Sequence, residues 1–187
     1  MLVIPFLPNW LNKYSALTDH WRKALNSIPP PAAQPVLNLE KLPLLQLWHE
    51  DGGHFVTLPL VYTESPTSGK HNLGMYRIQR YDQTTTGIHW QIHKGGGFHY
   101  FEAEKMNQSL PVTIFLGGAP AMILSAIAPL PEDVPELMLA SLLAGEKIKT
   151  AKNPIENGHR LIAEAEFAIC GKVAPHIRKP EGTFGDH

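Results

Sequence analysis

Side chains suited to chemistry gather between Asn72 and Tyr100, in the stretch NLGMYRIQRYDQTTTGIHWQIHKGGGFHY. Its second half alternates, so that His89, Gln91 and His93 would share one face of a strand and three apolar residues the other. A face with two imidazoles and an amide is unusual for a purely structural strand, and it is the first place to look for chemistry. Three consecutive glycines follow, and the backbone N–H groups of such a run can cradle a phosphate.

A β-hairpin is the element predicted to position these residues. Gly74–Tyr81 would be its first strand, the turn-forming sequence DQTTTG its turn, and Ile88–His93 its second strand. The remaining chain is predicted to form strands at His54–Tyr62, Pro111–Leu116 and Leu161–Cys170, and helices within Lys94–Asn107, over Ala121–Ala128 and from Asp133 onward.

The first 50 residues are predicted to form a helical arm and a proline-rich connector, and residues 51–187 a separate domain. Apolar residues recur at helical spacing within Ser15–Asn26, which favours a helix there. The proline run at 29–31 would end this helix and stiffen the connection.

The composition is ordinary for a soluble protein, with 43% apolar and 18% charged residues among 187. The net charge of −1 gives no electrostatic argument for binding nucleic acid or an acidic membrane. Cys170 is the single cysteine, which excludes an internal disulfide and fits a reducing compartment. No apolar run approaches the ~20 residues that cross a bilayer. We therefore expect a cytoplasmic protein with at most peripheral membrane association.

Three motifs together resemble a known family. The first begins at Asn72 and has the form N-x-G-x-Y-R, a turn, and H-[KR]-G-G. The second is IAPLPEDVPE at 127–136, and the third is PEGTFGDH at 180–187. Three motifs in this order are more specific than any one of them, and they resemble the UbiD-like decarboxylases over roughly residues 40–187.

The resemblance implies an α+β fold, a split β-barrel of the flavin-reductase type with packed helices. UbiD-like decarboxylases use prenylated FMN, with a divalent metal and K⁺ beside its phosphate, to decarboxylate aromatic or α,β-unsaturated acids reversibly. By motif position, Asn72, His93 and Glu136 would bind Mn²⁺ or Mg²⁺, which suits one nitrogen and two oxygen ligands. Backbone carbonyls near Ser125–Ala128 would approach K⁺. The residues implied to contact the cofactor are Asn72, Met75, Tyr76, Arg77, Ile92, His93, Lys94, Ala128, Pro129 and Glu136.

The same correspondence implies a catalytic set of Arg77, Glu181 and Asp186. Decarboxylation leaves a carbanion equivalent that must be protonated, which requires a positioned acid, here Asp186. Arg77 would hold the substrate carboxylate, and Glu181 would hold Arg77. Strict strand alternation puts Asn72 and Arg77 on opposite faces, so we expect a bulge or a strand that starts after Asn72.

Each of these residues also has a structural interpretation. Asn72 could open a strand, Arg77 could be solvated or paired, and Glu136 has the spacing of the acidic residue in a capping box. The two tail carboxylates could be solvated charges. His89 is an alternative to His93 as the metal ligand.

Relative to the family this chain is short, which implies a truncated or split member without the C-terminal domain that closes over the substrate. The leading hypothesis is the flavin-binding core of a UbiD-like (de)carboxylase, with 4-hydroxy-3-polyprenylbenzoate-type chemistry in quinone biosynthesis as one option. The alternative is a non-catalytic remnant or subunit that binds flavin or a partner chain. A metallohydrolase is a third option, but the chain lacks H-E-x-x-H and paired cysteines.

The partners expected from these hypotheses are a small-molecule carboxylic acid and further protein. The protein partner would be either another copy of the chain, giving a homo-oligomer, or a chain that supplies the missing domain. Absent domains should leave apolar surface uncovered, for which the candidates are Met1–Trp10 and the flank of Ala121–Ala128.

Overall fold

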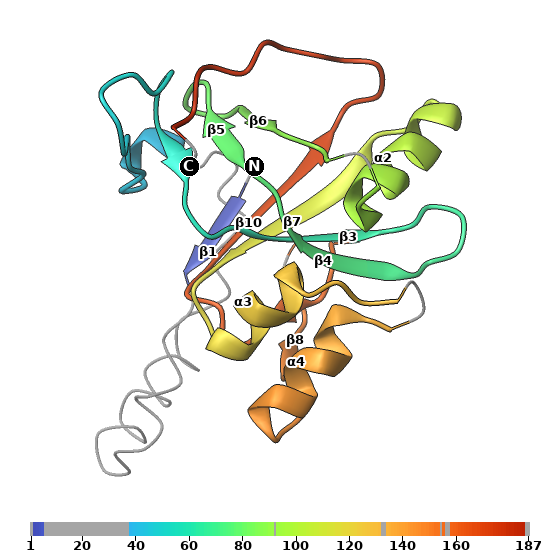
Figure 1. The fold of residues 1–187 in the computed structure, drawn as a ribbon. Coiled ribbons are helices and arrows are strands. Elements are labelled where there is room, and N and C mark those ends of the chain that lie inside the picture. Colours follow the sequence, from blue (N-terminus) through green and yellow to red (C-terminus); the bar gives the residue numbers. More distant parts are fainter. Residues whose placement is uncertain are drawn as a thin grey trace, which may run out of the picture.

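Two antiparallel sheets and three helices make up most of the described structure (Figure 1). The computed structural model describes residues 38–91, 93–131, 134–153, 155 and 158–185, together with the backbone of residues 2–5. The predicted helix over Ser15–Asn26 and the proline connector lie outside the described residues. The larger sheet has five strands, in the order β1 (Leu2–Pro5), β10 (Phe167–Val173), β7 (Leu110–Leu116), β3 (Leu60–Glu64) and β4 (His71–Met75).

The second sheet has three strands. It carries only part of the predicted hairpin, because Gly74 and Met75 of the predicted first strand Gly74–Tyr81 belong to β4 of the larger sheet. The strand order of the second sheet is β2 (Phe55–Val56), β5 (Ile78–Arg80) and β6 (Thr86–Ile88). The other elements are a 3₁₀ turn at Leu39–Lys41, the helices α2 (Gly95–Lys105), α3 (Pro120–Ile127) and α4 (Glu136–Ala144), and the paired strands β8 (Thr150–Ala151) and β9 (Leu161–Ile162). The predicted α+β class is confirmed. Among the described residues, the sheets do not join into a closed barrel.

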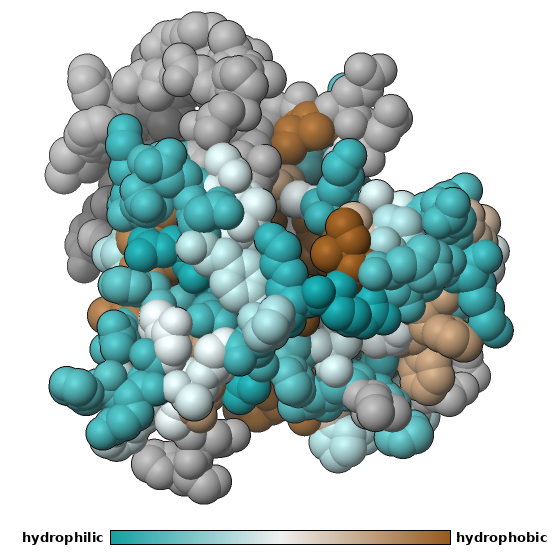
Figure 2. Space-filling model, turned by 90° about the horizontal axis from the view of Figure 1, so that it is seen from above, coloured by the Kyte–Doolittle hydropathy of each residue, from teal (hydrophilic) through white to brown (hydrophobic). Residues whose placement is uncertain are grey.

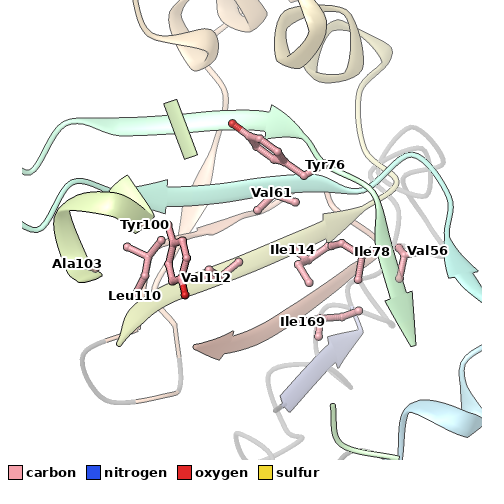
Figure 3. Close-up of a cluster of buried hydrophobic side chains, with 10 residues drawn as sticks. All are labelled: Val56, Val61, Tyr76, Ile78, Tyr100, Ala103, Leu110, Val112, Ile114 and Ile169. Atoms are coloured by element: carbon pink, nitrogen blue, oxygen red, sulfur yellow. The ribbon is translucent and has the colours of Figure 1, made fainter. Parts of the chain in front are cut away.

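The five-stranded sheet has a hydrophobic cluster on each face because its strands alternate. Val61 of β3 and Ile114 of β7 pack on one face, under Tyr100 of α2 (Figure 3). Their neighbours Leu60 and Phe115 pack on the other face, under α3 and α4. Helix α2 therefore lies on the opposite side of the sheet from α3 and α4 (Figure 1). The strand predicted at Pro111–Leu116 is confirmed as β7, paired on both sides.

Three predicted elements have different bounds. The strand predicted at Leu161–Cys170 is two strands, since the chain turns where Ala165 N–H donates to Ile162 O at 3.2 Å. The run His54–Tyr62 is also broken, because Leu58 has a positive φ of 48° before a proline. The second hairpin strand is β6, which ends at Ile88, before most of the residues predicted for it.

The helix predicted from Asp133 begins at Glu136, after Pro135 as its N-cap, so Glu136 is the first helical residue rather than the third. A further difference concerns the N-terminal arm. Residues 2–5, expected in a helical arm, form β1 and pair with β10.

The chain changes sheet between β4 and β5. Tyr76 and Arg77 belong to neither strand, and they separate the last residue of β4 from the first of β5. The conflict between the faces of Asn72 and Arg77 does not arise, because Asn72 lies in β4 and Arg77 lies in the connection between the two sheets. A search of the described residues finds no helix long and apolar enough to cross a membrane.

Candidate functional site

The C-terminal segment from 180 to 185 is anchored, although its sequence resembles a loose tail. Gln79 of β5 connects it to the loop at Gly52, because its Nε2 donates to Gly52 O at 2.9 Å and its Oε1 accepts from Gly182 N–H at 2.8 Å. Gly52 N–H also donates to Thr183 O at 2.8 Å, and Gly185 N–H to Asp51 Oδ1 at 2.8 Å. These hydrogen bonds fix the backbone on both sides of Phe184.

Close backbone contact explains the glycines in this segment. A Cβ added at Gly52 would lie 2.5 Å from the Cα of Gly182, so neither position has room for a side chain. The ring of Phe184 packs on Phe55, with centroids 4.6 Å apart. The anchoring therefore combines hydrogen bonds with an aromatic contact.

This anchoring brings Glu181 to Arg77. Arg77 Nε lies 2.6 Å from Glu181 Oε1 and Nη2 lies 2.7 Å from Oε2, a bidentate pair. His89 Nδ1 lies 2.9 Å from the same Oε2. The Arg77 guanidinium lies 5.0 Å from the centroid of the Phe184 ring, within cation–π distance.

Glu181 is the negative centre of this group. The hydrogen bond from Arg77, followed by the one from His89, lowers the pKa of Glu181 against the opposing effect of burial. Glu181 is therefore ionised at neutral pH. The side chains of Arg77 and Glu181 are 30% and 21% exposed, so they lie at a surface that a ligand can reach. Asp186, the predicted proton donor, lies outside the described residues.

The predicted metal ligands come from three elements that meet beside β4. Asn72 Nδ2 donates to Tyr76 Oη at 3.3 Å, and Gly96 N–H donates to the same hydroxyl at 2.9 Å. Glu136, at the start of α4, accepts from Leu73 N–H at 3.1 Å. Asn72 is buried and Glu136 is half-buried. The backbone next to Asn72 is thus in direct contact with Glu136.

His93 reaches this region through the loop before α2. A Cβ added at Gly95 would clash with Asn72 Oδ1, which places the amide oxygen against the backbone two residues after His93. His93 itself has a φ of 71°, in the left-handed region that favours glycine. Among the described residues, no hydrogen bond joins His93 to Asn72 or Glu136, and no cluster of three His, Cys, Asp or Glu residues could hold a metal. A metal here would need the Asn72 oxygen as a ligand.

The donor set nevertheless fits a hard divalent cation with a phosphate. It offers a carboxylate, an amide oxygen and an imidazole nitrogen. The glycine-rich start of α2 lies beside it, and its first turn contains no acidic residue. Backbone N–H groups at a helix N-terminus attract phosphate. The arrangement is therefore suited to a phosphorylated cofactor held with a cation.

The other residues implied to contact the cofactor are spread more widely. Met75 packs against the cluster under α3 and α4, and Tyr76 is only 1% exposed. Lys94 is the exposed N-cap of α2. Ala128 and Pro129 follow α3 directly, and no described hydrogen bond joins them to the predicted metal ligands. Ile92 lies outside the described residues.

A cleft of about 1010 Å³ opens beside Glu181 and His89. Its wall is largely apolar, with Ile88 and Trp90 contributing, and Lys179 is one of its charged residues. Seen from above, hydrophobic residues lie recessed between hydrophilic ones (Figure 2). A cleft of this size and lining suits a small organic ligand.

The contacts of two residues that complete this site were not predicted from the sequence. His89 was singled out for chemistry and as an alternative metal ligand, but its contact with Glu181 was not predicted, and Gln79 was not predicted to take part. The structure places His89 opposite Arg77 in the hairpin. Gln79 carried no local signal, since its contacts come from distant parts of the chain.

Comparison with known proteins assigns the family. The model of the UbiD family, described as a 3-octaprenyl-4-hydroxybenzoate carboxy-lyase Rift-related domain, matches residues 27–187. The chain belongs to the UbiD family. A relative from Chlamydia pneumoniae, described as part of a 4-hydroxybenzoate decarboxylase, is 56% identical over 151 residues, which are 81% of this chain and 26% of the relative.

Solved structures of UbiD-class enzymes resemble the fold. An evolved dimeric form of the UbiD-class enzyme HmfF from Pelotomaculum thermopropionicum, in complex with prFMN, is 27% identical with a TM-score of 0.76, over 82% of this chain and 35% of that one. The vanillic acid decarboxylase of Sedimentibacter hydroxybenzoicus in its closed form is 28% identical with a TM-score of 0.75, over 80% and 33%. The UbiD-family chain described here spans about a quarter of the length of the curated relatives it matches, at 26%.

Proposed function

We propose that this chain is the flavin-binding core of a UbiD-type decarboxylase that acts on an aromatic or α,β-unsaturated carboxylic acid in the cytoplasm. The observation that carries the proposal is the bidentate pair of Arg77 with Glu181, at 2.6 and 2.7 Å, beside a cleft large enough for a small organic acid. The family's chemistry needs a cation for the substrate carboxylate and a carboxylate to orient it. Both groups are present and in contact.

In this proposal each residue has a stated task. Glu181 holds the Arg77 guanidinium in one orientation, and Arg77 orients the substrate carboxylate. Asp186 donates the proton that replaces carbon dioxide. Prenylated FMN, when bound, supplies the electron sink. Asn72, His93 and Glu136 would hold Mn²⁺ or Mg²⁺ at its phosphate, with K⁺ near the carbonyls of Ser125–Ala128.

The proposal also includes a protein partner. Leu124 and Ile127 on α3 are 56% and 55% exposed, and Met138 and Leu142 on α4 are 57% and 77% exposed. Seven of the eight residues after Glu136 in α4 are apolar, and a helix that is apolar all round is normally buried. We propose that further polypeptide covers these helices, either a second copy or a chain that corresponds to the remaining length of the relatives. The pathway of the substrate, for example quinone biosynthesis, belongs to the same proposal.

The second candidate is a subunit that binds flavin or a partner chain without turnover. The observation that favours it is the exposed apolar surface of α3 and α4, which suits contact with a partner chain. Where the subunit binds flavin, the two candidates share the cofactor site and differ only in turnover.

Co-expression with a prenyl-FMN synthase tests the proposal. The purified chain is expected to carry a flavin absorbance band and a bound species with the mass of prenylated FMN. Purified protein without flavin would contradict the decarboxylase and would leave only a subunit that binds a partner chain. Bound cofactor without carbon dioxide release from a panel of aromatic acids, also in the presence of the partner chain, would favour the non-catalytic subunit.

A further inference from the structure

Tyr76 is part of the first family motif, yet its side chain is buried among other side chains. It lies in the connection between β4 and β5 and is only 1% exposed. Its ring belongs to the hydrophobic cluster under α2 (Figure 3) and packs at 68° to the ring of Trp90, with centroids 5.0 Å apart. Any role of Tyr76 in the site must therefore act through its neighbours.

The Tyr76 hydroxyl group connects two of the elements that meet at the predicted metal site. Its oxygen accepts one hydrogen bond from Asn72 Nδ2 at 3.3 Å and another from Gly96 N–H, in the first turn of α2, at 2.9 Å. A tyrosine oxygen can accept such bonds, and buried polar groups are costly without partners. One hydroxyl group thus holds both the Asn72 side chain and the start of α2.

The hydrogen bond to Asn72 decides which atom of its amide remains for a cation. The amide group is planar, so Oδ1 points away from the nitrogen that Tyr76 holds. Oδ1 lies against the backbone of Gly95, where an added Cβ would clash with it. Hard divalent cations bind the oxygen of an amide, because the NH₂ group only donates hydrogen bonds. The reversed orientation, with Oδ1 at Tyr76, would remove Asn72 as a ligand.

The packing leaves room for this hydroxyl group because two neighbouring residues are glycines. A Cβ added at Gly74 would lie 2.5 Å from Tyr76 Cε2, and one added at Gly96 would lie 2.9 Å from Tyr76 Oη. Ring packing alone would be served equally well by phenylalanine, which has no hydroxyl group to bury. The hydroxyl group is therefore explained by the hydrogen bonds that it accepts and not by the packing of the ring.

We propose that Tyr76 is a positioning residue for the divalent cation: its hydroxyl group holds the Asn72 amide so that Oδ1 is the atom offered to Mn²⁺ or Mg²⁺. The inference rests on the metal site of the proposed function. It assigns Tyr76 a different task from the direct cofactor contact that the family resemblance implies. Groups that orient metal ligands typically change the metal affinity by about 10–100-fold when they are removed.

Titration of the flavin-loaded chain with Mn²⁺, followed by electron paramagnetic resonance, tests the inference without turnover. Tyr76→Phe keeps the ring and removes the hydroxyl group, and it should weaken Mn²⁺ binding by about tenfold or more. Tyr100→Phe is the matched control. Tyr100 is 5% exposed and also packs on Trp90, but its hydroxyl group donates elsewhere, to Ala174 O at 3.0 Å. The control should lose stability as Tyr76→Phe does and keep the Mn²⁺ affinity of the wild type.

An Asn72→Asp background separates the orientation of the amide from the packing of the ring. The two oxygens of a carboxylate are equivalent, so neither has to be selected. Tyr76→Phe should therefore cost less Mn²⁺ affinity in this background than in the wild type. An equal loss in both backgrounds would overturn the inference, because it would show that Tyr76 acts through packing alone.

A measurement on the wild type covers the case in which Tyr76→Phe does not fold. In ¹⁵N-labelled, flavin-loaded protein, the Nδ2 resonance of Asn72 should shift on addition of Mg²⁺, because the oxygen of the same amide becomes a ligand. An unchanged resonance would overturn the inference. Mn²⁺ affinity that falls in Asn72→Ala but not in Tyr76→Phe would overturn the inference alone and leave the proposed metal site in place. Equal affinity in the wild type and Asn72→Ala would overturn both.

Discussion

The two halves of the candidate site differ in how far the protein completes them by itself. At Arg77 and Glu181, both carboxylate oxygens are hydrogen-bonded at 2.6 and 2.7 Å. At the predicted metal site, the Asn72 amide donates to Tyr76, and Glu136 accepts from the backbone of Leu73. Within the described part of the chain, no hydrogen bond connects His93 to either of them. The pairing of Arg77 with Glu181 is held in place by the fold, whereas the proposed metal site would need a cation to bring its ligands together.

Arg77→Ala should produce the largest effect and tests the preorganised half. We expect decarboxylation by the cofactor-loaded chain to fall by at least about 10²-fold, because the substrate carboxylate loses the guanidinium proposed to orient it and Glu181 loses its bidentate partner. Steady-state rates measure the loss, and flavin absorbance shows whether the cofactor remains bound. Arg80→Ala, which removes an arginine that contacts His54 instead, is the control. Unchanged turnover in Arg77→Ala would exclude the proposed mechanism.

Glu136→Gln tests the half that depends on a cation. The amide oxygen of glutamine can still accept from Leu73 N–H, so the fold should be retained, but the lost negative charge should weaken Mn²⁺ binding by about tenfold or more. Titration of the flavin-loaded chain with Mn²⁺, followed by electron paramagnetic resonance, reports the affinity. Glu146→Gln, on the exposed loop after α4, serves as the matched control. Equal Mn²⁺ affinity in wild type and Glu136→Gln would remove Glu136 from the site.

Gln79→Leu tests the anchoring of the C-terminal segment without changing a residue that is proposed to take part in the reaction. Gln79 is 4% exposed, and its loss leaves Gly52 O and Gly182 N–H without their partner. We expect the free energy of unfolding to decrease by about 1–3 kcal/mol, with a parallel loss of turnover as Glu181 becomes less well placed. Urea denaturation gives the stability. Gln83→Leu, which changes an exposed amide on the hairpin turn, should leave the free energy of unfolding nearly unchanged.

The smallest effect should come from Glu104 of α2, which pairs with Arg178, just before the C-terminal segment. Arg178 Nη1 and Nη2 lie 2.7 and 2.9 Å from the two oxygens of Glu104, and this pairing lowers the pKa of Glu104 from 4.5 to about 2. A carboxylate whose pKa is lower in the folded than in the unfolded protein stabilises the fold at pH values above its unfolded pKa. This stabilisation is lost as the pH falls towards the pKa of the folded state. Glu104→Gln should therefore lower the free energy of unfolding at pH 7, and by less at pH 3.

Denaturation curves of wild type and Glu104→Gln at the two pH values measure this difference. The exposed carboxylate of Glu40 provides the matched control, Glu40→Gln. A difference between wild type and Glu104→Gln that stays constant from pH 7 to pH 3 would show that the ion pair does not cause it.

The hairpin turn could be predicted from the sequence because its turn-forming residues are neighbours in the chain. The pairing of Arg77 with Glu181 could be predicted from the resemblance to the family. The hydrogen bonds that anchor the C-terminal segment could not be predicted. The polar groups that hold the segment, Gln79 and Asp51, are distant in sequence and have no motif of their own. The change of sheet between β4 and β5 was expected only as a bulge or as a strand that starts after Asn72, since alternation within one strand does not reveal where the chain leaves it. The break at Ala165 was not predicted, because the alternation of apolar and polar residues continues across it and is the same for one strand or for two.

The separation of Glu181 from its partners has a consequence for the order of folding. Arg77 and His89 are joined by a short hairpin turn, whereas 104 residues separate Arg77 from Glu181. Closing a long loop costs more chain entropy than closing a short one, so local pairs are expected to form earlier. Arg77 and His89 should therefore be brought together before Glu181 arrives. In an incompletely folded chain the Arg77 guanidinium would not yet have Glu181 as its partner, and docking of the C-terminal segment would supply that carboxylate.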